Sequence, residues 1–182
     1  MALTVKQLNN DASFLLVFEP IEAAPTGLFA PPEPFRVLVD PCDVAPPKAS
    51  LASYVLEACA SPLRQVPQPD VIVISNARSD HCNEATLRHF ASSGTKTLIL
   101  AEPAAARVIR SWKYFDRDKV RTIEAWRDPR AQASNRRRVL RIPVPAAWPG
   151  GRSGEVTVTL MIRLASLGRG PSLCRGFWSF RS

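Results

Sequence analysis

Apolar and polar positions in the first part of the chain follow strand periodicity. Residues 3–8 alternate between apolar and polar side chains, as a half-buried strand does. A turn cluster at residues 9–11 separates this segment from the more continuous apolar run at 12–18. The two segments therefore predict an N-terminal hairpin. Residues 35–39 predict a third strand, which ends at the proline that follows Asp40.

In the middle of the chain, strand and helix patterns alternate. Residues 46–60 and 84–90 have apolar positions near helical spacing, and residues 104–112 predict a helix with proline in its first turn. Residues 71–74 are apolar throughout, which is typical of a strand buried on both faces, and residues 96–101 predict a second interior strand.

Three later segments, at 120–124, 139–142 and 156–161, again have strand patterns. The order of strands, alternating strands and helices, and strands again predicts an α/β domain of the layered α+β kind, with helices on one face of a mixed sheet. We assign residues 1–161 to this domain. Residues 162–182 contain no acidic residue and no clear period, so we predict an atypical basic tail, either disordered or an artefact of the gene model.

The composition is that of a globular protein, with 46% apolar and 22% charged residues. The net charge of +8 is uneven, because residues 1–128 carry a net charge of −1 whereas residues 129–182 carry ten arginines and one acid. Such an asymmetry can mark a nucleic-acid-binding arm, here with Arg136, Arg137 and Arg138. We regard nucleic acid as an unlikely partner, because the excess charge is confined to residues 129–182, the part of the chain that includes the atypical tail.

Neither a membrane span nor a secretory signal is visible, since the chain has no run of about 18 apolar residues and no basic N-terminus before an apolar core. The four cysteines, Cys42, Cys59, Cys82 and Cys174, are irregularly spaced and form no Cys-x-x-Cys motif. They predict free thiols in a reducing compartment. We therefore expect a soluble protein of the cytoplasm with no membrane partner.

The segment from Val71 to His81 carries the main chemical signal, because a buried strand leads into a short loop that ends in Asp80-His81. This arrangement resembles the metal-binding turn of the metallo-β-lactamase superfamily. Residues 14–18, 37–41 and 97–103, with the helix that follows, resemble other parts of the first half of that family's domain. Residues 79–87 further resemble a compact fungal-type subgroup. The resemblance implies a metallo-β-lactamase-like fold, and the atypical tail implies that its αββα sandwich is incomplete.

The resemblance also implies a metal site that has lost ligands. The family pattern is close to Thr/Ser-His-x-His-x-Asp-His, and Asn76 and Arg78 occupy the positions of its first two histidines. Asp80 and His81 remain as candidate metal ligands, but zinc usually takes three or four protein ligands. Arg78 is a permanent cation and opposes a metal ion. We therefore expect no cofactor. If the site is functional, its cofactor is zinc or another divalent metal.

Several side chains of the loop have alternative interpretations. Either Asp80 or Asn83 can cap the helix that follows. Arg78 can pair with Asp80 or with Asp40, or can be solvated. His81 is either a hydrogen-bonded structural residue or a ligand. Cys82 as a nucleophile lacks an obvious base in the sequence.

The favoured hypothesis is a catalytically impaired member of the fold, a pseudoenzyme that serves as a binding or interaction module. The alternative is a metal-dependent hydrolase of unknown substrate that uses Asp80 and His81, with its catalytic residues otherwise unknown. An incomplete sandwich leaves apolar sheet surface uncovered. The hypothesis therefore predicts that the chain associates with itself through that surface.

Overall fold

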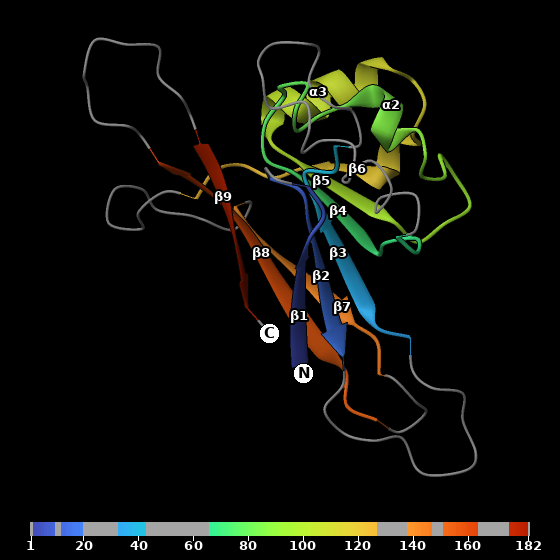
Figure 1. Cartoon of the computed structure of the whole chain (residues 1–182), viewed down its shortest axis with the longest axis vertical. Helices are drawn as coiled ribbons and strands as arrows, with labels where there is room; N and C mark the ends of the chain where they lie inside the picture. Colours follow the sequence, from blue (N-terminus) through green and yellow to red (C-terminus); the bar gives the residue numbers. More distant parts are fainter. Residues whose placement is uncertain are drawn as a thin grey trace.

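A computed structural model describes residues 2–9, 12–19, 33–42, 66–126, 138–146, 151–163 and 175–181. Within these residues two sheets form the body of the molecule (Figure 1). The larger has six strands in chain order: β1 (Ala2–Gln7), β2 (Phe14–Glu19), β3 (Phe35–Val39), β4 (Val71–Ile74), β5 (Leu98–Ala101) and β6 (Val120–Thr122). The smaller has three: β7 (Val139–Val144), β8 (Gly154–Arg163) and β9 (Arg175–Arg181).

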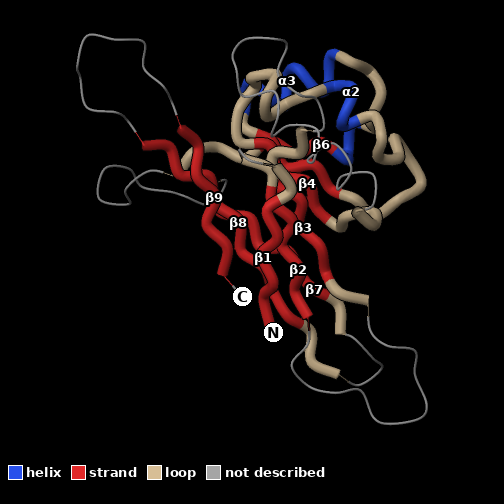
Figure 2. Tube along the Cα trace, in the orientation of Figure 1, coloured by secondary structure: helices blue, strands red, loops and turns tan. Residues whose placement is uncertain are grey.

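The larger sheet is mixed, as the sequence predicts. Strands β1 to β3 pair antiparallel, and β3 to β6 pair parallel. Two α-helices, α2 (Glu84–Leu87) and α3 (Pro103–Ser111), lie in the connections between parallel strands, and a 3-10 helix, η2 (Arg117–Lys119), precedes β6. Figure 2 shows α2 and α3 on the same side of this sheet. None of the helices in the described part is long and apolar enough to span a membrane.

Each face of the larger sheet has its own apolar core. On the helix side, Ile72 and Ile99 pack with Ile109 of α3, and all three are at most 1% exposed. On the other side, Val37 and Val73 pack with Leu160 of β8, and all three are fully buried. The described layers are therefore helix, sheet and sheet, which is an incomplete αββα arrangement.

This second core changes one expectation. The sheet face that we expected to be uncovered is covered by the smaller sheet, because β7 and β8 contribute alternating buried side chains to the inter-sheet core. Among the described residues, the exposed large apolar side chains are Leu3, Val5 and Trp126. Self-association remains a prediction.

Element bounds follow the sequence predictions closely where hydrophobic patterning is strong. The predicted strands at 35–39 and 71–74 are confirmed, but α2 ends at Leu87 rather than at residue 90. The predicted helix at 46–60 lies outside the described residues. The predicted domain boundary between residues 161 and 162 falls inside β8. The predicted tail also includes β9 at Arg175–Arg181, whose backbone pairs with β8.

Candidate functional site

Asp40 is the centre of a buried polar network at the carboxyl ends of β3 and β4. These two strands are parallel neighbours, so Asp40, directly after β3, lies beside Ser75, directly after β4. The Asp40 backbone has φ +43°, a left-handed conformation that aspartate tolerates better than most residues, and its N–H donates to the Val73 carbonyl at 2.8 Å. The side chain is thereby turned toward the loop after β4.

Three polar groups surround the Asp40 carboxylate. The residue Asp40 is 4% exposed. Oδ1 accepts from the Ser75 backbone N–H at 2.7 Å, and Oδ2 accepts from the Ser75 hydroxyl at 2.6 Å. His81 Nδ1 lies 2.9 Å from Oδ2. Because an ionised carboxylate only accepts, this contact requires the proton to be on Nδ1. We call Asp40, Ser75 and His81 the Asp40 network.

The loop between Ser75 and α2 is held by its own hydrogen bonds. Asn76 Oδ1 accepts from the Arg78 N–H at 2.9 Å, which is an Asx turn. The Arg78 carbonyl accepts from the His81 N–H at 2.9 Å. Asn83, and not Asp80, caps α2, since its Oδ1 accepts from the Thr86 N–H at 3.0 Å.

Arg78 pairs with Asp80 and not with Asp40. The guanidinium Nη2 lies 3.0 Å from Asp80 Oδ2, with the two side chains 64% and 37% exposed. The same Asp80 oxygen lies 3.8 Å from His81 Nε2. The two residues predicted as metal ligands therefore do lie together, but the Asp80 oxygen between them is also paired with the Arg78 guanidinium.

The donor set does not fit a zinc ion of the usual kind. His81 Nε2 and Asp80 Oδ2 provide two donors, whereas zinc sites in proteins take three or four. Across the described ranges, no three His, Cys, Asp or Glu side chains lie close enough together to hold a metal. His89, the other histidine, is exposed beyond the end of α2. Arg78 adds a positive charge where a divalent cation would need negative ligands.

Cys82 is buried beside the network and is poorly suited to nucleophilic chemistry. The residue is 5% exposed, and burial, with the nearby carboxylates of Asp40 and Glu102, raises the pKa of its thiol from 9.0 to about 12. The thiolate is the reactive form, and this pKa makes it about a thousandfold rarer near neutral pH. Cys42, the other described cysteine, is half-buried.

Thiol labelling tests the low reactivity of Cys82. In a chain with C59S and C174S, we expect iodoacetamide at pH 8 to leave Cys82 unmodified in the native protein over a time that alkylates it in the urea-unfolded chain, as measured by peptide mass spectrometry. The high folded-state pKa also means that the unfolded thiol ionises first, so Cys82 should lower the stability of the fold as the pH rises from about 9 toward 12. Rapid alkylation of Cys82 in the native protein would contradict the burial of this thiol.

The nucleic-acid candidates are only partly described. Arg136 and Arg137 lie outside the described residues. The Arg138 side chain is 12% exposed, and its Nε lies 3.6 Å from Glu124 Oε2. The described arginine is thus mostly covered by the protein, and nucleic-acid binding through these residues remains a prediction.

Sequence patterns missed two members of this site. Ser75 is part of the Asp40 network. Ser13, directly before β2, supports the network because its hydroxyl donates to the Asp40 backbone carbonyl at 2.6 Å. A signal was present, because polar residues directly after adjacent parallel strands meet at one sheet edge. Ser13 and Ser75 are among the few buried polar residues described.

Comparison with known families gives one finding. A family model described as the beta-lactamase superfamily domain matches residues 35–173. No curated protein and no solved structure gives a significant match to the chain. The matched residues include β3, the Asp40 network and both strands β7 and β8.

Proposed function

Because this chain belongs to the beta-lactamase superfamily, we propose that it is a catalytically impaired member of the metallo-β-lactamase-like group, which serves as a cytoplasmic binding or interaction module. The observation that carries the proposal is the ion pair of 3.0 Å between Arg78 and Asp80. A permanent cation neutralises one of the two remaining candidate ligands, so this carboxylate is already compensated without a metal ion.

The Asp40 network supports the same proposal. The Nδ1 atom of His81 contacts a buried carboxylate, which orients the ring. Metal-bound histidines are often oriented in the same way, through the ring nitrogen that does not bind the metal. In this chain the same contact has a structural use, because it ties the loop after β4 to the end of β3. The loop thus keeps its shape through Asp40, and the outward side presents Arg78 and Asp80 to solvent.

The alternative function, a hydrolase that uses Asp80 and His81 with a metal, predicts a different metal content. We expect the purified full chain, equilibrated with zinc and then dialysed, to hold far less than one metal ion per chain by elemental mass spectrometry. Stoichiometric zinc, iron or manganese that is lost in D80A or H81A would favour the hydrolase and contradict our proposal.

A variant that gains zinc binding gives a more direct test than the metal content of the natural chain. The double variant N76H/R78H removes the cation and adds two imidazoles, so we expect it to bind zinc at least about tenfold more tightly than the natural sequence in a competition titration. R78Q is the matched control, because it removes the charge without adding a ligand. If N76H/R78H bound no more zinc than R78Q, the loop would not have the geometry of a former metal turn.

A further inference from the structure

A cavity of about 330 Å³ lies between the two sheets and shares no lining residue with the Asp40 network. Strands from both sheets line it, together with the two residues that follow β6: Leu100, Arg121, Thr122, Ile123, Glu124, Val139 and Leu140. We call this space the inter-sheet cavity. Arg121, Thr122 and Glu124 are exposed, so the cavity reaches the surface of the molecule.

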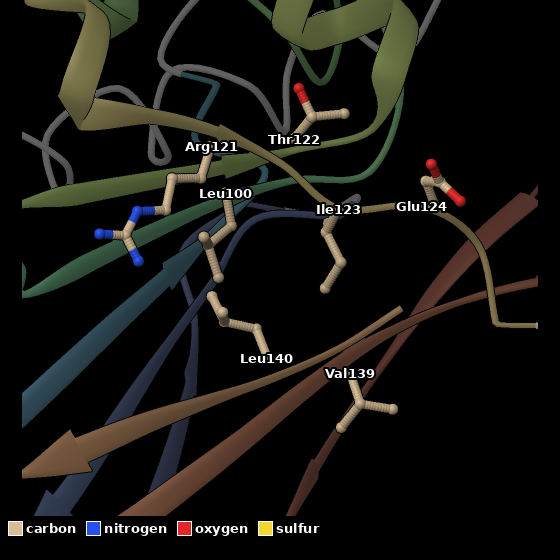
Figure 3. A pocket seen from close by; sticks show the side chains of 7 residues that line it. All are labelled: Leu100, Arg121, Thr122, Ile123, Glu124, Val139 and Leu140. Carbon is tan, nitrogen blue, oxygen red and sulfur yellow. The ribbon is translucent and has the colours of Figure 1, made fainter. Parts of the chain in front are cut away.

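The walls of the cavity are apolar. Leu100 is fully buried and Ile123 is 2% exposed. Figure 3 shows the side chains of Leu100, Ile123 and Leu140 pointing toward one another in the space between the sheets. β6 and β7 are edge strands of their sheets, and the chain that follows β6 reaches the smaller sheet at Ala125, which forms a β-bridge with Leu160. The volume falls at the lower end of the range of about 300–1,000 Å³ that small-molecule sites occupy.

The mouth of the cavity carries an uncompensated positive charge within the described residues. Leu100 and Arg121 are register partners on β5 and β6, so both side chains lie on the sheet face that is turned toward the smaller sheet. The Glu124 carboxylate pairs with Arg138 at 3.6 Å. In the described part of the chain, no ion pair links an acidic side chain to Arg121.

From this combination we propose that the inter-sheet cavity binds a small organic monocarboxylate with an aliphatic body. The aliphatic part lies among Leu100, Ile123 and Leu140, where it removes apolar surface from water. The carboxylate lies at the mouth and accepts charge-assisted hydrogen bonds from the Arg121 guanidinium. The charge of this ligand class is opposite to that of Arg121, whereas an aliphatic cation is repelled by Arg121. The proposal is independent of whether the loop near Asp80 binds metal.

The proposal is tested by isothermal titration calorimetry of the full chain with octanoate. We expect saturable binding of one octanoate per chain, and binding of octanamide, which has the same shape but no charge, about tenfold weaker. R121Q should weaken octanoate about tenfold and leave octanamide unchanged. The matched control is R141Q, since Arg141 is a 74% exposed arginine on β7 that does not line the cavity.

A second variant locates the ligand. L140W places a large ring in the cavity and should abolish binding of both compounds while the circular dichroism spectrum stays unchanged. Absence of octanoate binding to the natural chain, equal affinity for octanoate and octanamide, or equal losses in R121Q and R141Q would each overturn the proposal. R121Q alters an exposed side chain, so it keeps the test decisive even where L140W fails to fold.

Discussion

Replacing Asp40 with alanine should lower the free energy of unfolding by about 3–5 kcal/mol, because each buried polar group that loses its partner costs about 1–3 kcal/mol. The carboxylate contacts the Ser75 N–H, the Ser75 hydroxyl and His81 Nδ1, so in D40A two buried Ser75 groups and the partly buried His81 ring lose this partner. Alanine is also less tolerant than aspartate of the φ of +43° at this position. Urea denaturation of the full chain, monitored by tryptophan fluorescence, measures the loss.

Two matched variants separate the causes of this effect. D40N keeps the side-chain shape and the tolerance of the left-handed backbone, and its amide oxygen can still accept from one donor, so its loss should be smaller than that of D40A. D80A removes a carboxylate of the same loop that is 37% exposed, and it should cost less than about 1 kcal/mol. A loss in D40A no larger than that in D80A would show that the Asp40 network does not stabilise the fold.

Replacing Leu160 with alanine should lower the free energy of unfolding by about 2–5 kcal/mol. Leu160 is fully buried in the inter-sheet core, and its carbonyl accepts from the Trp126 N–H at 2.7 Å, so β8 is tied to the chain that follows β6. The cavity left by L160A cannot collapse easily, because strands of two sheets surround it. The measurement is again urea denaturation, with a single transition expected.

Leu3→Ala is the control for this second prediction, since Leu3 on the edge strand β1 is 49% exposed. Its loss should stay within about 0.5 kcal/mol. A loss below about 1 kcal/mol in L160A would mean that the smaller sheet contributes little to the cooperative core. A large loss would instead show that the strand that crosses residue 161 is an integral part of the domain.

The local pattern of the sequence was sufficient for most elements of the larger sheet. The run at Val71–Ile74 is apolar at every position and is buried at every position, because a central parallel strand has a core on each face. Glu102 and Pro103 mark the start of α3, where the Glu102 carboxylate accepts from the Ala104 N–H at 2.9 Å. These features depend on neighbours in the chain, which a sequence shows directly.

The placement of the smaller sheet was harder to predict. Its strands β7 and β8 have recognisable patterns, but a pattern does not tell which surface a strand covers. The inter-sheet core unites Val37 with Val156 and Leu160, residues that are far apart in the chain. The sequence therefore predicted an uncovered sheet face that tertiary packing in fact covers.

The sequence by itself determined the family resemblance and the order of the strands along the chain, because each of these is a property of consecutive residues. It also predicted that Asn76 and Arg78 replace two metal ligands. Only the tertiary structure decided which partner each polar side chain has. Asp40 meets Ser75 and His81 across 35 and 41 residues of chain, and Arg78 turns to Asp80. Parallel strands place their carboxyl ends side by side, and this long-range pairing determines which polar side chains meet at the loop.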